Sequence, residues 1–307
     1  MEYKDSADIA LNDKLASLRS RFSNEEIKLQ ERALRNMSEY QELSDEWSGY
    51  WTYERDLNDI FEESGCEVFS YSGYCIMCNT HYPLVVDFRF ANIINGKKNV
   101  NWPERLVCPN CRLNSRQRYL TKIIFDYHLQ GKSILSYEEY PYRLVKREVN
   151  DFSAVSYAGP GHVGMIDGLD CVDICNLPFD DESFDLLVAS DTFHVAHDYR
   201  KAFKEGYRVL KYGGKLSFIA PFFWDREKTE ERARFFDGNV YKFTDAIYSG
   251  NPAPSLEPRL IYQVFGWDVL DSLKKAGFED AYVKAYYSME DGYMGYLPIC
   301  IEAIKGE

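Results

Sequence analysis

Positive charge and long apolar runs are both scarce in this sequence. Lys and Arg number 36 against 49 Asp and Glu, which leaves a formal net charge of -13. A protein that binds phosphate backbones usually presents a basic face, so we expect no nucleic-acid partner. No stretch approaches the roughly 18 apolar residues of a membrane span, and the charged N-terminal region holds no apolar core of signal-peptide length. We therefore expect a cytoplasmic protein with no membrane partner.

Cysteine is well represented, with eight residues. Disulfide frameworks are typical of short secreted chains, so metal binding is the first interpretation here. Cys75 and Cys78 form one C-x-x-C pair, and Cys108 and Cys111 form a second. Each pair can place two thiolates on one turn, and four thiolates close a tetrahedral zinc site with no open position, which predicts structural zinc. The alternatives are small core residues or a redox pair, and Cys66 is a spare ligand candidate.

The chain is expected to have three parts. Residues 1–65 form an N-terminal helical segment, because apolar residues recur at roughly helical spacing over two stretches, the second including Ile27, Leu29, Leu34 and Met37. These helices could pack on the body, cap the active site or form a homodimer. Residues 66–114 form the small zinc-ribbon-like module, and residues 115–307 form the largest domain.

Residues 115–307 alternate between strand-like and helix-like patterns. The expected strands are 133–137, 154–157, 168–174, 184–190, 215–220, 281–287 and 297–304, and the expected helices include 115–131, 199–211 and 268–276. This alternation predicts an α/β fold with a doubly wound sheet. Residues 222–262 break the pattern, so we expect an insertion that serves as a lid or pocket wall, with 225–234 as a solvated helix. Cys171, Cys175 and Cys300 are read as ordinary buried thiols.

Two runs carry a family resemblance, DICNLPFDDESFDLLVAS at 173–190 and YRVLKYGGKL at 207–216. They closely resemble the central half of class I S-adenosylmethionine-dependent methyltransferases of the type 11-like group. The runs CPNCRLNSRQR at 108–118 and FGWDVLDSLKKAGF at 265–278 are similar to a subgroup in which a four-cysteine zinc knuckle precedes the methyltransferase domain. The resemblance implies a Rossmann-like sheet and S-adenosylmethionine as cofactor.

The resemblance also implies where that cofactor lies, at the carboxyl ends of the first strands. The family's acidic residue facing the adenine amine matches Asp173, and the loop after the first strand offers Glu138 and Glu139. The remaining implied cofactor residues are Ser156, Gly159, Ile174 and Ser190. The first loop lacks the usual glycines, and a serine stands where a ribose-binding carboxylate is expected.

Candidate acid-base residues follow the fourth strand. His194, His197 and Asp191 are the catalytic candidates there, and His162 lies in the glycine-rich loop. A histidine side chain titrates near neutral pH and can remove the proton of an acceptor. The substrate candidates are the aromatic residues of the insertion, Phe222, Phe223, Trp224, Tyr241 and Phe243, which could instead anchor the insertion to the body.

These features predict methyl transfer to an oxygen or nitrogen of a small-molecule or saccharide acceptor. The acidic surface and the aromatic insertion, which could stack on a ring, favour that acceptor class. The first alternative is a catalytically inactive binding or scaffold protein that keeps the fold and the zinc site, because two cofactor loops depart from the family pattern. The second is a methyltransferase for protein or nucleic acid with the knuckle as reader, which the net charge disfavours.

Overall fold

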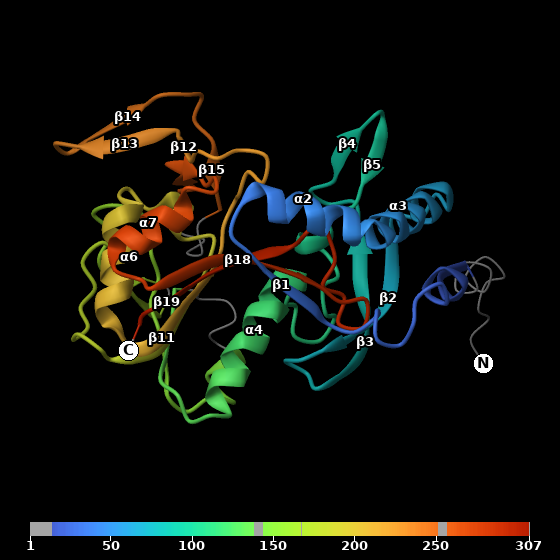
Figure 1. Ribbon diagram of the computed structural model, residues 1–307, viewed down its shortest axis with the longest axis horizontal. Helices are drawn as coiled ribbons and strands as arrows, with labels where there is room; N and C mark the ends of the chain where they lie inside the picture. Colours follow the sequence, from blue (N-terminus) through green and yellow to red (C-terminus); the bar gives the residue numbers. More distant parts are fainter. Residues whose placement is uncertain (1–13, 138–143, 167, 251–256, 307) are drawn as a thin grey trace. The chain divides into compact units, whose positions relative to one another are not determined.

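The structure, a computed structural model, describes residues 14–137, 144–166, 168–250 and 257–306. The chain divides into two compact units, each combining segments that are distant in the sequence (Figure 1). The first comprises Met1–Arg32, Gln41–Tyr119 and Ala285–Pro298, and the second comprises Ala33–Tyr40, Leu120–Lys284 and Ile299–Glu307. The boundaries expected after residues 65 and 114 stay a prediction.

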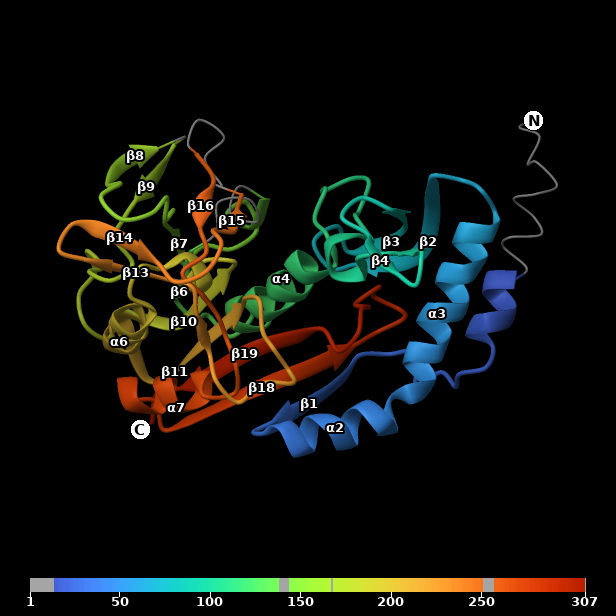
Figure 2. The same ribbon diagram turned by 90° about the horizontal axis from the view of Figure 1, so that it is seen from above.

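Four parallel strands form the centre of the main sheet. In spatial order they are β7 (Phe152–Ala154), β6 (Ile134–Ser136), β10 (Phe184–Ser190) and β11 (Leu210–Ile219) (Figure 2). The order continues with β19 (Ile299–Ile304), which is antiparallel to β11, and then with β18 (Asp280–Tyr287) and β1 (Gln30–Leu34). The chain progresses outward from β6 to β7 and returns on the other side of β6 as β10. The order of the strands therefore reverses at β6, and the carboxyl ends of the strands at such a reversal are the usual ligand position in open α/β sheets.

The sequence of β10 explains its central position. Its residues from Leu186 to Ala189 are at most 2% exposed, as expected for a parallel strand covered on both faces. Leu186 pairs with Ile134 of β6 on one side and with Lys215 of β11 on the other. The predicted strand 184–190 is confirmed with the same bounds.

Helix α6 (Tyr199–Val209) connects β10 to β11. The Asp198 carboxylate accepts a hydrogen bond from the Lys201 backbone N–H at 3.0 Å and so caps the first turn. The helix buries Phe203 against Phe193, with the ring centroids 5.0 Å apart. The cap and the buried aromatic face position the loop after β10 at the carboxyl edge of the sheet.

The insertion forms short strands where the sequence pattern favoured a helix. They are β12 (Glu230–Glu231), β13 (Ala233–Phe236), β14 (Asn239–Lys242), β15 (Tyr248–Ser249), β16 (Arg259–Leu260) and β17 (Gln263–Val264), and helix α7 (Val269–Ala276) follows. The predicted helix over 225–234 is therefore wrong. Asp237 and Gly238 have φ of 50° and 75° between paired Phe236 and Asn239, so a two-residue turn with a left-handed backbone sets the β13–β14 hairpin.

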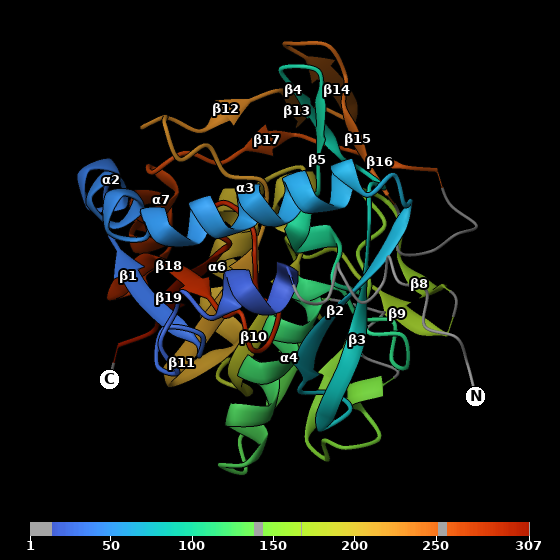
Figure 3. The same ribbon diagram turned by 90° about the vertical axis from the view of Figure 1, so that its right-hand side faces the viewer.

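The first unit contains helical and hairpin elements. They are α3 (Ser48–Glu63), most of α2 (Met37–Glu46), the hairpins β2 (Val68–Cys75) with β3 (Thr80–Asp87) and β4 (Asn92–Ile94) with β5 (Lys97–Asn99), and the start of α4 (Ser115–His128) (Figure 3). Phe61 of α3 stacks on Phe69 of β2, with centroids 4.1 Å apart. Helices α2 and α3 lie within residues 1–65, but they begin only at Met37, where the second stretch whose spacing predicted a helix ends.

One N-terminal stretch departs from the expected helices. The helical spacing that includes Leu29, Leu34 and Met37 predicts a helix, but residues Gln30–Leu34 form β1 at the edge of the main sheet beside β18. Leu34 is 2% exposed, while the three residues before it are exposed. Pairing with a strand some 250 positions later overrides the local pattern, because strand formation depends on long-range partners.

Candidate functional site

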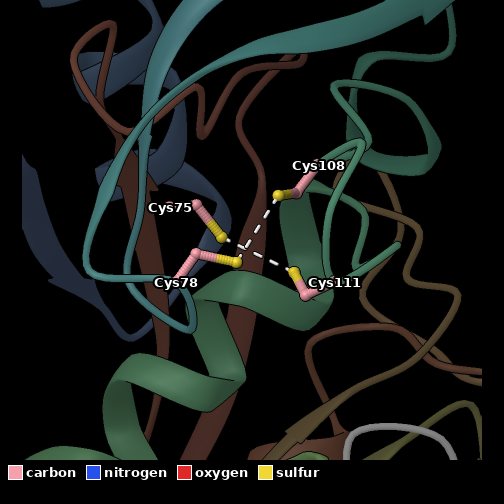
Figure 4. Close-up of side chains that lie close together, drawn as sticks. All are labelled: Cys75, Cys78, Cys108 and Cys111. Atoms are coloured by element: carbon pink, nitrogen blue, oxygen red, sulfur yellow. Dashed lines mark hydrogen bonds between the residues drawn. The ribbon is translucent and has the colours of Figure 1, made fainter.

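The four cysteines of the two C-x-x-C pairs lie together in the first unit. Cys75 ends β2 and Cys78 lies in the following turn, while Cys108 and Cys111 come from the segment before α4. Their sulfurs lie within 4.8 Å of one another and point toward a common centre (Figure 4). Cys75 Sγ is 3.6 Å from Cys111 Sγ, and Cys78 Sγ is 3.8 Å from Cys108 Sγ. We call this group the cysteine cluster.

Tight turns bring each pair into position. The Cys78 backbone N–H donates to the Cys75 carbonyl at 3.1 Å, and the Arg112 N–H donates to the Cys108 carbonyl at 2.9 Å. Arg112 has a φ of 67°, so the chain turns back directly after the second pair. The Asn110 amide donates to Cys78 Sγ at 3.3 Å, a hydrogen bond that favours a thiolate at that sulfur.

The electrostatics of the cysteine cluster favour a bound cation. The hydrogen bond from the Cys111 thiol lowers the pKa of Cys75 to about 5. The same bond, together with burial, raises the pKa of Cys111, and burial raises the pKa of Cys78. One thiolate therefore opposes ionisation of its neighbours unless a positive ion compensates. Tetrahedral zinc with Zn–S bonds near 2.3 Å separates its sulfurs by about 3.8 Å, so these residues fit that ion.

Arg118 connects the cysteine cluster to the loop between β18 and β19. Its side chain is fully buried, and one guanidinium nitrogen donates to the carbonyls of Tyr74 at 3.0 Å and of Asp291. The other nitrogen donates to the carbonyls of Leu106 at 3.2 Å and Gly292 at 3.1 Å. A buried arginine that donates hydrogen bonds to four backbone carbonyls fixes the backbone on both sides of the cysteines. This gives the last residue of the 108–118 run a physical role.

The second unit gathers the predicted cofactor residues at the carboxyl edge of its sheet. Ser156 follows β7 and is 2% exposed, and its hydroxyl has no hydrogen-bond partner among the described residues. Gly159 has a φ of 115°, which an L side chain rarely adopts. Asp173 is partly exposed, and its carboxylate accepts the Cys175 backbone N–H at 2.9 Å, while Ile174 is buried. Glu138 and Glu139 lie outside the described residues.

The residues after β10 occupy two different environments. Ser190 ends the strand, and its hydroxyl donates to the Asp191 carboxylate at 3.2 Å. His194 is 1% exposed, so its ring lies in the interior. His197 is partly exposed, and its Nδ1 lies 3.2 Å from the Tyr157 hydroxyl. Of the two candidate histidines after β10, only His197 is open to solvent.

His197 also lies beside Asp173 and Cys175, which come from one loop. One imidazole nitrogen of His197, one carboxylate oxygen of Asp173 and the Cys175 sulfur lie within 4.8 Å of one another. Burial, followed by the charges of Asp173 and Asp198, raises the pKa of Cys175 to about 12, and its thiol donates to the Asp198 carbonyl at 3.3 Å. The sulfur is therefore a neutral thiol with a hydrogen-bond acceptor, which distinguishes this trio from the cysteine cluster.

Sequence reasoning missed Tyr157, Cys175 and Arg259. The guanidinium of Arg259 donates to the carbonyls of Tyr157 at 3.0 Å, Asp191 at 3.2 Å and Gly250 at 3.1 Å, joining the loops after β7 and β10 to the insertion. The ligand-binding motifs of such sheets consist of acidic residues and glycines, and neither a lone tyrosine nor an arginine in an irregular insertion gives a local signal. These roles follow from the fold.

The predicted substrate aromatics occupy several places in the insertion. Trp224 stacks on Tyr40, with centroids 5.2 Å apart, and Phe222 meets Trp267 edge-on at 5.2 Å. The Arg226 guanidinium lies over the Phe223 ring. Tyr241 and Phe243, in and just after β14, are 51% and 53% exposed.

A hollow of about 660 Å³ opens beside His197, and we call it the α6 hollow. Its lining residues come from the loop after β10, the start of α6 and the insertion: His197, Asp198, Tyr199, Arg200, Lys201, Lys204, Glu231, Ala233, Arg234, Phe235 and Gln263. Phe235 meets the His197 ring edge-on at 5.3 Å. The insertion thus supplies an aromatic wall, but through Phe235, which is outside the five predicted aromatics.

Comparison with known proteins gives a family for the centre of the sheet. Residues 154–218 match the model of the family described as methyltransferase domain. This stretch is similar to a methyltransferase domain. It spans the loops after β7 and β9 (Leu169–Cys171), strand β10, His197, α6 and most of β11. The resemblance to class I methyltransferases and the predicted Rossmann-like α/β fold are confirmed, and the four predicted cysteines lie together as expected.

Solved structures give weaker likenesses. An S-adenosylmethionine-dependent methyltransferase from Mesorhizobium loti is 13% identical, with a TM-score of 0.40, and the match covers 64% of this chain and 100% of the other. One from Clostridium acetobutylicum is 15% identical, with a TM-score of 0.38, covering 61% and 90%. No curated protein matches the chain significantly. None of the helices in the described ranges is long and apolar enough to span a membrane.

Proposed function

We propose that the protein transfers a methyl group from S-adenosylmethionine to an oxygen or nitrogen of a small-molecule or saccharide acceptor. The observation that carries the proposal is the meeting of Asp173 and His197, from the loops after β9 and β10, within the matched methyltransferase domain. Both lie where an open α/β sheet binds its ligands. The α6 hollow begins at His197 and provides space for an acceptor on that side.

The residues of this edge fit the cofactor. The buried hydroxyl of Ser156 has no hydrogen-bond partner among the residues described, and the same holds for the buried Tyr137 hydroxyl after β6. Buried hydroxyls normally have a partner, so two of them beside neighbouring strand ends suit a ligand that carries hydroxyls and a carboxylate. Asp173 would accept from the adenine amine next to Ile174, and the left-handed Gly159 lets the backbone approach the ligand.

His197 is the base in this proposal. The bound cofactor supplies an electrophilic methyl group whose bond to the sulfonium sulfur breaks, with the electron pair staying on sulfur, as the acceptor atom bonds to the methyl carbon. His197 takes the proton from that acceptor atom, and Tyr157 at 3.2 Å holds the imidazole in place. His194, 1% exposed, and Asp191 are then positioning residues for the loop.

We further propose that the cysteine cluster holds one structural zinc ion. Four sulfur ligands fill a tetrahedral site, so the ion would stabilise the first unit and leave no position for a substrate. Arg118 and the turns after each pair hold the ligands in this geometry. Cys66 is exposed and is separate from the four clustered sulfurs.

The competing function is a binding or scaffold protein that has lost the cofactor. The absence of a ribose-binding carboxylate after β7, where Ser156 stands, favours this alternative. Isothermal titration calorimetry with S-adenosylhomocysteine separates the two functions. Micromolar binding supports the methyltransferase, whereas no heat of binding at millimolar ligand would leave the scaffold function. A homodimer through the N-terminal helices remains a separate prediction, which sedimentation analysis tests.

A further inference from the structure

The α6 hollow is basic, although the chain as a whole is acidic. Four of its lining residues are Arg or Lys, namely Arg200, Lys201, Lys204 and Arg234, against the acidic Asp198 and Glu231. The net charge of the chain is -13. A local reversal of charge inside a concave surface attracts an anionic ligand, because the low-dielectric walls focus the field of the basic groups.

The acidic residues of the α6 hollow are already engaged. The Glu231 carboxylate receives two hydrogen bonds from Arg234, at 2.7 and 2.6 Å, and Asp198 caps α6 through the Lys201 backbone N–H. Among the described residues, the nitrogens of Arg200, Lys201 and Lys204 have no carboxylate within the 4.0 Å of an ion pair. The three free cations therefore determine the charge that an incoming ligand meets.

A second, smaller hollow continues the basic surface. It measures about 260 Å³ and shares Arg200 and Lys204 with the α6 hollow. Near α7 it adds Lys228 and Lys275, together with the acidic Asp268 and Asp271. The Arg200 guanidinium lies over the Tyr199 ring, 4.4 Å from its centroid, and this cation–π contact holds the side chain in place. The two shared residues lie in the first two turns of α6 and line both hollows.

We infer that the acceptor carries an anionic group, a phosphate or a carboxylate, which Arg200, Lys201 and Lys204 bind while its nucleophilic atom lies at His197. This inference rests on the proposed methyl transfer and narrows its acceptor class. Phe235, edge-on to His197, forms the apolar wall for the uncharged part of the molecule. Lys204 and Lys201 act as point charges, and Arg200 offers a planar fork suited to oxyanions.

Inorganic pyrophosphate is the probe for this site. We expect calorimetry to detect its binding to the wild-type protein, both alone and with saturating S-adenosylhomocysteine, because the anion site is separate from the cofactor edge. In the double variant Lys201→Gln, Lys204→Gln the affinity should fall on the order of tenfold through the loss of two partly screened charges. The matched control is Lys122→Gln, Lys132→Gln, which removes the same charge from α4 and from the turn before β6 and should bind as the wild type.

The two proposals fail in distinguishable ways. Absence of pyrophosphate binding to the wild type, or an equal loss in both double variants, would overturn the anion site even if S-adenosylhomocysteine binds. Pyrophosphate binding that is lost only in the α6 variant, without S-adenosylhomocysteine binding, would support the anion site and overturn the methyl transfer. The α6 variant should keep the wild-type affinity for S-adenosylhomocysteine and the wild-type melting temperature, since both lysines are exposed.

Discussion

Replacing Cys108 and Cys111 together by serine removes two of the four sulfurs that surround one point in the first unit. The sulfur pairs are 3.6 and 3.8 Å apart, close to the roughly 3.8 Å that zinc imposes on four thiolates. Neither distance is compatible with a disulfide, whose sulfurs lie near 2.05 Å. The wild-type protein should therefore contain one zinc per chain, and the double variant should contain almost none.

The loss of stability follows from the position of the cluster. Cys108 is fully buried and Cys111 is 8% exposed, so the serine hydroxyls would be enclosed without the ion. Structural zinc contributes roughly 10 kcal/mol or more to the folding free energy of small peptides. The first unit also has a core of its own, so the double variant should lose less, about 3 kcal/mol of the free energy of unfolding. That loss lowers the melting temperature of a domain of this size by about 6 to 12 °C.

The assay combines elemental analysis with thermal unfolding followed by circular dichroism. Cys66→Ser is the matched control, because Cys66 is an exposed cysteine outside the cluster and should leave zinc content and melting temperature unchanged. If the double variant keeps one zinc per chain, or melts with the control, the cluster does not bind structural zinc and the reasoning from sulfur geometry is refuted.

Three further predictions concern the second unit. Asp173→Ala should weaken S-adenosylhomocysteine binding by about 1 to 3 kcal/mol in calorimetry, and unchanged affinity would move the adenine site elsewhere. Trp224→Ala should lower the free energy of unfolding by about 1 kcal/mol through loss of the Tyr40 stack, with cofactor affinity intact; a drop in turnover without loss of stability would place it in the acceptor site. Glu302 is fully buried; burial opposes its ionisation, but Lys215 and Lys284 hold its pKa below the ordinary value of 4.5. Its contribution to the free energy of unfolding is therefore present above pH 4.5 and is lost as the pH falls further. Glu302→Gln should cost about 2 to 3 kcal/mol in denaturant unfolding at pH 7 and flatten the acid dependence, and an unchanged acid limb would contradict this.

The sequence predicted the parts of the fold that depend on local pattern. The apolar run Phe184–Ser190 indicated a buried parallel strand, and the strand has those bounds because both of its faces are covered. The two C-x-x-C pairs indicated one cluster, since their spacing limits the geometry. The helix over 225–234 failed because Glu230–Glu231 pair with β17 and the residues from Ala233 on pair with β14, long-range partners that composition alone does not show.

The candidate site was predicted only where the family motif extends. Asp173 begins the first family run and His197 lies between the two runs, and the structure brings them together. Phe235, Arg200 and Lys204 line the same hollow, but Phe235 meets His197 only because the β13–β14 hairpin lies beside the start of α6. A basic residue on an amphipathic helix normally indicates a solvated face, so the sequence held no sign that these lysines surround a concave surface.

A crystal structure of the protein grown with S-adenosylhomocysteine tests the central claim most directly. The account predicts the ligand at the carboxyl ends of β6, β7 and β10, with the adenine amine on the Asp173 carboxylate, the ribose near the Ser156 hydroxyl and the sulfur facing the His197 side. Ligand density elsewhere on the chain, or none at millimolar concentration, would contradict it.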